Sequence, residues 1–371
     1  MTVGRVWGRA QLLALAAEHG HVPLDLSLGV AADPEPVPAA ADERRGTAAQ
    51  YPPSRGTAEL LAAVSGYLER RFGVSVPVDS VAVCVGAKEF IATAPLFLRD
   101  SRAGTDARDT VLIPALGYPP YELGARLAGL RPYRVPADSE FRMRLDLLPE
   151  DVAARSLCLW VNSPANPTGV LELLTRCAEW GREHGVLVLS DEAYADTTWS
   201  GPPRTILSGG LAGVLAVHSL SKRSNAPGLR VASYSGDRRL VEELADRRRA
   251  AGLMAADLAQ ARAALLFGDD RQAAAQQVRN RRRVAELVAE LNANGLTCTA
   301  PEGGLFVWLS LPDRDAAAFV RDAAIHAGII LAQGDSYGPA GHGHVRIAAV
   351  HDRAVVAPRL ALLSERLVGV S

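Results

Sequence analysis

The sequence predicts an α/β protein with a mostly parallel central sheet flanked by helices, together with a smaller α+β domain. Short and almost continuously apolar segments, such as "VLIP" and "VLVLS", alternate with helical segments. Strands that are buried on both faces of a parallel sheet have this composition. The character of the sequence changes after about residue 250, and a chain of 371 residues with 48% hydrophobic residues is long enough for two domains.

The N-terminal part is predicted to form one helix followed by a linker. Residues 10–17, "AQLLALAA", resemble a signal peptide only superficially, because the apolar run is short and contains Gln11, so we expect an amphipathic helix. Residues 31–43 are rich in proline and alanine, which breaks any helix. The next helix, predicted over residues 56–73, places five apolar residues on one face: Leu60, Leu61, Val64, Leu68 and Phe72.

The remaining elements divide between a large and a small domain. Predicted strands of the large domain cover residues 81–86, 111–114, 157–162, 186–190 and 214–219, with a helix over 87–98. The small domain has a helical region over residues 252–294, a helix over 315–327, a final helix, and strands over 305–311, 329–332 and 344–350. We therefore divide the chain into an N-terminal segment packed on the small domain (residues 1–40), the large domain (41–250) and the small domain (251–371).

Composition and charge favour a small-molecule partner. Forty basic and 41 acidic residues give a net charge of -1, so no global field attracts nucleic acid or an anionic membrane. No apolar run approaches the roughly 20 residues that a membrane span needs. The four cysteines show neither a CxxC pair nor a metal-ligand pattern, which predicts reduced thiols, a cytoplasmic location and no metal site.

Polar residues follow several predicted strands, at the edge where ligands bind in open α/β sheets. Gly86, Ala87 and Lys88 stand at a strand-to-helix turn, which either presents backbone N–H groups to a phosphate or is a plain tight turn. The loop "NSPANPTG", which contains Asn166, follows the strand at 157–162. Its residue types also form ordinary turns.

Two further strand ends carry groups suited to an aromatic aldehyde cofactor. Asp191 and Tyr194 could hold a protonated ring nitrogen and a ring oxygen, although a helix N-cap followed by a core tyrosine is the alternative. Lys222 could form a Schiff base with an aldehyde, and Arg230 could bind a phosphate with two nitrogen atoms. A lone lysine is usually a solvated cation. Features at four strand ends together favour the covalent role.

These motifs resemble one enzyme family over nearly the whole chain. "SLSKRSNAPGLRVA" is similar to the cofactor-attachment motif of class I/II pyridoxal-phosphate-dependent aminotransferases of fold type I, and "NSPANPTG", "SDEAY" and "EGGLFVW" fit the same family in the same order. Within it, "QYPPSRGTAEL", "GAKE", "IPALGYPPYELGARLAG" and "GDSYGPAGHGHVRIA" are most similar to actinobacterial N-succinyldiaminopimelate aminotransferases. The strand "VASYSGD" is more polar than is usual in the family.

The resemblance implies roles for residues of this chain. Lys222 would carry pyridoxal 5'-phosphate as a Schiff base, Asp191 would keep the pyridine nitrogen protonated, and Tyr194 would bond to the ring oxygen; these three are the implied catalytic residues. Further cofactor contacts would come from Asn166, from Tyr118 stacked on the ring, and from a phosphate-binding set: Gly86, Ala87, Lys88, Ser219, Ser221, Arg230 and Tyr51 of the other subunit of a homodimer.

Substrate contacts and three possible functions complete the prediction. Arg346 would bind the α-carboxylate of the substrate, with Gly29 and Asn166 close to it. The first function is an aminotransferase acting on a 2-oxo acid and an α-amino acid, either a diaminopimelate-like one or another specialised amino acid. The others are a lyase, cyclase or oxidase that uses the same cofactor, and a non-catalytic binding module. The intact cofactor residues argue against the last. Lys88 and Arg55 either meet a distal acid of the substrate or are solvated.

Overall fold

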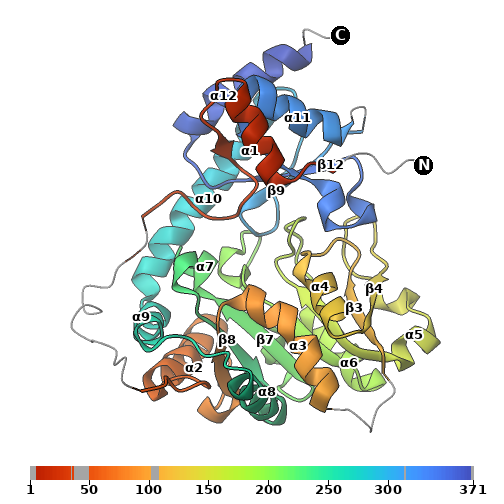
Figure 1. Ribbon diagram of the computed structural model, residues 1–371, viewed down its shortest axis with the longest axis vertical. Helices are drawn as coiled ribbons and strands as arrows, with labels where there is room; N and C mark the ends of the chain where they lie inside the picture. The colour runs from red at the N-terminus through yellow and green to blue at the C-terminus, as the bar shows by residue number, and fades with distance from the viewer. Residues whose placement is uncertain (1–5, 35, 37–49, 102–107, 313–314, 369–371) are drawn as a thin grey trace.

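The computed structural model describes residues 6–34, 36, 50–101, 108–312 and 315–368. They form a lower unit around a large sheet, which also includes α9 (Asp257–Gly268), and an upper unit that contains both the first helix and the elements that follow α9 (Figure 1). Of the predicted linker over residues 31–43, positions 35 and 37–43 lie outside the described residues. In the described part, no helix has both the length and the apolar composition to cross a membrane.

The large sheet confirms the predicted α/β class. Its seven strands lie in the order β2-β8-β7-β6-β5-β3-β4. Only β8 runs antiparallel to its neighbours. The strands are β2 (Val81–Cys84), β3 (Thr110–Pro114), β4 (Arg131–Val135), β5 (Ser156–Asn162), β6 (Leu187–Asp191), β7 (Val214–Ser219) and β8 (Ala232–Gly236).

Helices cover both faces of this sheet, which explains why its central strands are apolar throughout. One hydrophobic core joins the sheet to α2 (Ala58–Phe72), α6 (Leu174–His184) and α9 (Asp257–Gly268). A second core on the other face joins it to α3 (Ala87–Ser101), α4 (Pro120–Leu127) and α8 (Arg238–Ala250). All seven residues of β5 are buried between the two cores.

The upper unit combines the two ends of the chain. Its antiparallel sheet has the order β11-β12-β9, with β9 (Phe306–Ser310), β11 (Ala332–Gln333) and β12 (His344–Ala348). Helices α10 (Asp270–Ala293), α11 (Ala316–Ala327) and α12 (Arg353–Val368) surround it. From the N-terminus, α1 (Arg9–Glu18) buries Leu12 and Ala16 in the same core, and β1 (Leu24–Asp25) pairs in parallel with β10 (Ile329–Ile330).

Several elements differ from the sequence prediction. The helical region expected over residues 252–294 is two helices, and residues 252–256 lie outside them; the carboxylate of Asp269 caps the second by accepting from the Gln272 N–H. The single strand expected over residues 329–332 is two short strands, β10 and β11, that pair in different sheets. The edge strand β4, "RPYRV", was not predicted because its composition is polar and its first residue is exposed.

Candidate active site

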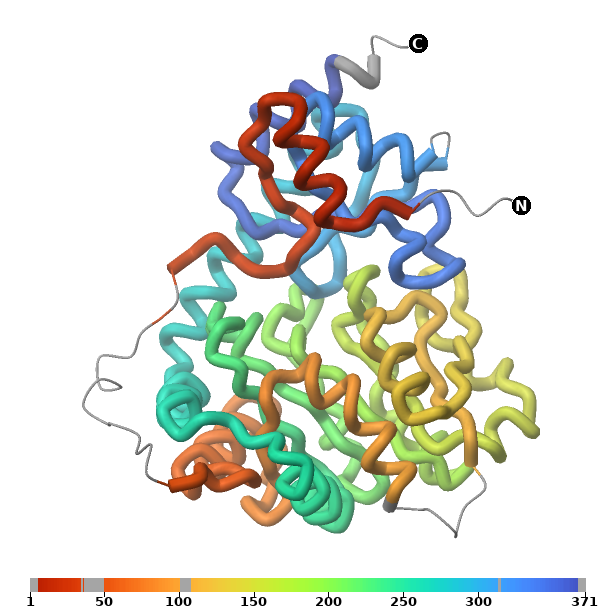
Figure 2. Tube along the Cα trace, in the orientation of Figure 1, coloured from red at the N-terminus to blue at the C-terminus, as the bar shows by residue number. Residues whose placement is uncertain are grey.

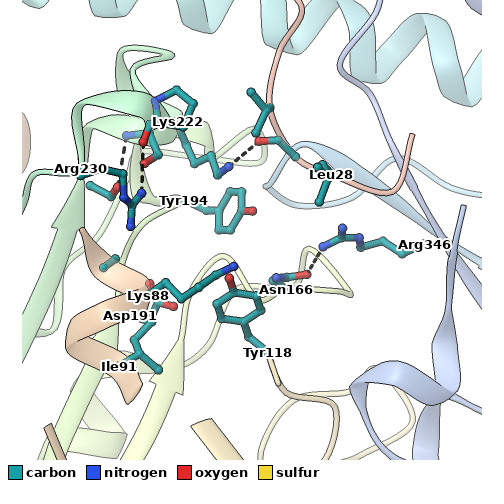
Figure 3. A pocket seen from close by; sticks show the side chains of 16 residues that line it. Leu28, Lys88, Ile91, Tyr118, Asn166, Asp191, Tyr194, Lys222, Arg230 and Arg346 are labelled. Atoms are coloured by element: carbon teal, nitrogen blue, oxygen red, sulfur yellow. Dashed lines mark hydrogen bonds between the residues drawn. The ribbon is translucent and has the colours of Figure 1, made fainter. Parts of the chain in front are cut away.

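A cavity of about 300 Å³ lies at the carboxyl edge of the large sheet (Figure 3). Most of the predicted cofactor and substrate residues line it: Gly29, Ala87, Lys88, Tyr118, Asn166, Asp191, Tyr194, Ser219, Ser221, Lys222, Arg230 and Arg346. The lining also includes four residues that were not predicted: Leu28, Val30, Ile91 and Pro227. Residues from separate parts of the chain therefore meet in one pocket.

Strand register explains how these residues come together. Asn162, the last residue of β5, lies opposite Asp191, the last residue of β6, so the two strands end at the same level. In the antiparallel pair of β7 and β8, Ser219 at the end of β7 faces Ala232 at the start of β8. Arg230, just before β8, consequently lies at the same edge as the residues that follow β7.

Lys222 projects into the cavity from a short helix, α7 (Leu220–Arg223), that directly follows β7. The Ser219 side chain caps this helix by accepting from the Ser221 N–H at 3.2 Å. The Lys222 amine donates to the Gly29 carbonyl oxygen at 2.5 Å. Burial, together with the positive charges of Arg346 and Lys88, lowers the pKa of Lys222 to about 8. A substantial fraction of this amine is therefore neutral, and so nucleophilic, near neutral pH.

Asp191 is buried at the floor of the pocket, with 4% of its surface exposed. Burial raises the pKa of its carboxyl group, whereas two hydrogen bonds lower it. The Tyr121 hydroxyl donates to one carboxylate oxygen at 2.8 Å, and the Ala193 N–H donates to the other at 3.1 Å. These donors hold the carboxylate in a fixed orientation, in which it could bind a cationic ring nitrogen.

Two supporting residues were given no role from the sequence. Tyr121 lies three residues after Tyr118, and the second tyrosine of "GYPPY" was the available signal; its phenol is fully buried. The side chain of Asn162 donates to the Asp191 carbonyl at 2.8 Å and accepts from the Asn166 N–H at 2.7 Å. Asn162 thus connects the strand end that carries Asp191 to the loop that carries Asn166.

The opposite wall of the pocket suits a phosphate. Gly86 has a φ of 83°, and a Cβ atom at this position would overlap the Arg230 guanidinium. Arg230 is itself in the left-handed region with a φ of 55°, and it donates to the carbonyls of Val85 and Pro227. Helix α3 begins at Ala87, directly beside this guanidinium. A helix N-terminus and an arginine at one place favour a bound dianion.

Arg346 stands across the pocket on β12 and is 5% exposed. It donates to the Asn166 side-chain oxygen at 2.6 Å and to the carbonyl of Ser27. Its guanidinium carbon lies 4.9 Å from the ring centroid of Phe306 and 5.2 Å from that of Tyr337. No ion pair among the described residues joins it to a carboxylate, and its Nε has no hydrogen-bond partner there. A buried guanidinium in this state favours an anionic ligand.

Three residues that were considered from the sequence do not line the pocket. Tyr51 is 90% exposed and lines a separate hollow with Arg55 and Met254, so it does not reach the pocket of its own chain. Gly86 lies behind Arg230 rather than on the pocket surface. Arg55 donates to the carbonyls of Val81 and Asp79 and does not line the cavity.

The comparison with known families agrees with this geometry. A model of the family "aminotransferase class I and II" matches residues 24–360. The chain belongs to this family. Its members depend on pyridoxal phosphate, so this protein is a pyridoxal-phosphate-dependent aminotransferase, and the comparisons do not favour the lyase, cyclase or oxidase alternative.

Several relatives of this chain are named as transaminases or aminotransferases. It is 37% identical to 4-dedimethylamino-4-oxo-anhydrotetracycline transaminase OxyQ of Streptomyces rimosus, over 90% of each chain. It is 33% identical to the LL-diaminopimelate aminotransferase of Desulforudis audaxviator, over 86% of this chain and 82% of the relative. A solved structure of a probable N-succinyldiaminopimelate aminotransferase from Thermus thermophilus matches with a TM-score of 0.83 and 25% identity, over 96% and 98% of the two chains.

The residues present fit pyridoxal phosphate in charge and chemistry. The side with Arg230 and the N-terminus of α3 suits the phosphate, and the buried Asp191 carboxylate suits the ring nitrogen. The amine of Lys222, which burial keeps partly neutral, lines the same cavity. The three groups that the cofactor requires thus occur in one cavity of the size typical of small-molecule sites.

Proposed function

We propose that this aminotransferase accepts an α-amino acid whose side chain carries a second anionic group, as a diaminopimelate-like substrate does, and transfers its amino group to a 2-oxo acid. The observation that carries the proposal is the position of Lys88 in the pocket. Relatives named as diaminopimelate and N-succinyldiaminopimelate aminotransferases support it. The structure also separates the two cations considered from the sequence, because Lys88 lines the cavity and Arg55 does not.

The resemblance assigns Lys88 to the cofactor phosphate, but its side chain points away from Arg230 (Figure 3), which leaves it available for a second anionic group of the substrate. Its amine lies 5.7 Å from the ring centroid of Tyr118, and none of the ion pairs among the described residues includes it. In Figure 3 its side chain extends beside Tyr118 toward the middle of the pocket, away from Arg230. The neighbouring Glu89 is engaged elsewhere, with the Arg248 guanidinium at 2.6 Å. A second substrate carboxylate would give Lys88 the opposite charge that it lacks.

The chain's own groups can perform the steps of transamination. When bound, pyridoxal phosphate supplies an electron-withdrawing ring that stabilises negative charge at the substrate α-carbon. We propose that Lys222 is the covalent attachment point and, once released, moves a proton at the α-carbon through its Nζ, for which a pKa of about 8 is well placed. Asp191 would hold a proton on the ring nitrogen. Arg346 would bind the α-carboxylate and orient the substrate.

We also propose a cytoplasmic homodimer with shared active sites. The exposed Tyr51 lies in a largely apolar hollow with Arg249 and Met254, which supports contact with a second subunit. A monomer by light scattering with full activity would contradict the dimer.

The four cysteines form no disulfide and three of them are buried, which supports a cytoplasmic location. We also propose a division of the chain into residues 1–40, 41–250 and 251–371. The pairing of β1 with β10 supports the packing of the first segment on the last, whereas α9 packs against the large sheet.

The substrate class is tested by Lys88→Met and two amino acids of equal chain length. L-2-Aminoadipate ends in a carboxylate and L-norleucine ends in a methyl group, and transfer to 2-oxoglutarate is followed for both. We expect kcat/KM for L-2-aminoadipate to fall about tenfold or more in the variant, as loss of a charge-assisted contact of ~1.5–3 kcal/mol predicts. The value for L-norleucine should fall much less, because only the higher pKa of Lys222 in the variant affects it. Equal losses for both substrates would assign Lys88 to the cofactor instead.

A further inference from the structure

The edge strand β4 and the hairpin after it contact the upper unit at three points. We call residues 134–144 the clasp segment. An isolated bridge between Ala137 and Met143 closes its hairpin. In Figure 2 the yellow chain of this region lies directly beneath the blue C-terminal chain. None of its side chains lines the cavity.

The first contact point is Arg134, at the base of the clasp segment. Its guanidinium donates to the Tyr337 carbonyl at 3.2 Å, to the Ala115 carbonyl at 3.1 Å and to the Glu122 carboxylate at 2.6 Å. The same Tyr337 carbonyl accepts from the Gly117 N–H at 2.9 Å. Arg134 therefore ties the loop before Tyr118 to Tyr337, whose ring contacts the Arg346 guanidinium.

The second contact point is Arg142, at the end of the hairpin. It donates to a Glu302 carboxylate oxygen at 2.8 Å and to the Leu171 carbonyl at 3.3 Å. The same oxygen of Glu302 accepts from the Leu171 N–H at 2.9 Å, and Gly303 N–H donates to the Gly169 carbonyl at 2.9 Å. Through these bonds the loop that carries Asn166 is attached to the residues that precede β9.

The third contact point is Phe141, at the tip of the hairpin. Its ring centroid lies 5.7 Å from that of His344 and 6.5 Å from that of Trp308, both edge-to-face. Trp308 is the direct strand partner of Arg346 across β9 and β12. Phe141 has a φ of 67°, a conformation that a bulky residue adopts only where its surroundings enforce it.

We propose that the clasp segment positions Arg346 relative to Asn166 and so controls recognition of the substrate α-carboxylate, with Arg134, Phe141 and Arg142 as positioning residues. This inference rests on the proposed function. Arg346 and Asn166 come from different units, and one hydrogen bond of 2.6 Å joins their side chains. Two-pronged binding of a carboxylate requires placement within about 0.5 Å. The three contacts of the clasp segment connect the same two units on either side of this bond.

The experiment compares Arg142→Ala with a matched control, Arg144→Ala. Arg144 belongs to the same hairpin, but its ion pair among the described residues is a local one, with Asp146 at 2.5 Å. The holoenzyme is mixed with L-glutamate or with 4-aminobutyrate, which lacks the α-carboxylate, and the single-turnover loss of the cofactor absorbance band is recorded. We expect Arg142→Ala to raise the half-saturating L-glutamate concentration about fivefold to tenfold, with 4-aminobutyrate and the control within about twofold of wild type.

Two further measurements decide the proposal. Adding Arg142→Ala to Arg346→Ala should cause no further loss with L-glutamate, because both changes act on the same carboxylate contact. Amide hydrogen exchange should quicken at Leu171 and Gly303 in Arg142→Ala and not in the control. Equal losses with both substrates, independent losses in the double variant, or unchanged exchange would overturn the clasp. If the wild type does not react with L-glutamate, that result counts against the proposed function alone. The amide hydrogen exchange rates then still test the role of the clasp segment.

A variant that does not fold is replaced by Arg142→Lys or Glu302→Gln. Arg142→Lys keeps the charge but cannot reach both Glu302 and the Leu171 carbonyl, so it should show a smaller change in the same direction. Glu302→Gln keeps an acceptor for the Leu171 N–H and removes the ion pair with Arg142. Retention of the wild-type half-saturating concentration and exchange rates in both variants would refute the role of this contact.

Discussion

The ionisation of Lys222 leads to a quantitative prediction for cofactor attachment. Burial and the charges of Arg346 and Lys88 lower its pKa from the ordinary value of 10.5 to about 8. At pH 7 this difference makes the neutral amine ~300-fold more abundant than for an exposed lysine. Because the neutral amine is the nucleophile, the rate of attachment should rise with pH and level off above about 8.

The assay mixes apoenzyme with pyridoxal phosphate over a range of pH from about 6 to about 10 and follows the absorbance of the attached cofactor by stopped flow. In Lys88→Met one positive neighbour is gone, so the pKa of Lys222 should rise and the midpoint of the rate profile should move upward. A wild-type rate that still rises without a plateau at the upper end of this range, as the ordinary value of 10.5 would give, or a midpoint that Lys88→Met leaves unchanged, would refute this account. The sequence contains only these two lysines, so borohydride reduction and peptide mapping identify the attachment site. We expect the label on Lys222.

Two further substitutions test the ends of the pocket. Gly86→Ala should weaken cofactor binding about tenfold or more in equilibrium dialysis, because the new Cβ would overlap the Arg230 guanidinium and the φ of 83° costs a further ~1–2 kcal/mol; Gly73→Ala, also at positive φ but with no atom near its Cβ, is the control, and equal affinity in both variants would contradict the overlap. Arg346→Ala should lower kcat/KM for α-amino acids at least about tenfold, as removal of a charge pair of ~2–5 kcal/mol predicts, while the borohydride label remains; an unchanged kcat/KM would mean that another group holds the carboxylate.

One topological rule was sufficient to predict from the sequence that residues at four strand ends meet in the pocket, whereas Tyr118, Gly29 and Arg346 were predicted from the family resemblance alone. Parallel strands present their carboxyl ends at the same edge, so polar residues after four apolar segments were expected together. The structure brings Lys88, Asn166, Asp191 and Lys222 into one cavity. The catalytic roles assigned to them stay predictions for the experiments above.

Other parts of the site leave little trace in the sequence. The carbonyls of Ser27 and Gly29 accept from Arg346 and Lys222, and a backbone carbonyl is the same for every residue type. The contacts of Arg142 with Glu302 join positions 160 residues apart, and no local pattern of charges indicates such a pair. The helix break before α10 has only a short signal, Gly268 followed by the capping residue Asp269, between two long helical segments.

The placement of the N-terminal segment has a consequence for protein synthesis. Leu24 is paired with Ile329, and the Gly29 carbonyl accepts from Lys222, so an early part of the chain completes the pocket only after a late part has emerged from the ribosome. About 300 residues separate the partners, which at ~5–20 residues per second corresponds to roughly 15–60 s of translation. The lower sheet can assemble within that interval. Until it ends, the apolar face of the first helix must stay unpaired or be covered by a chaperone.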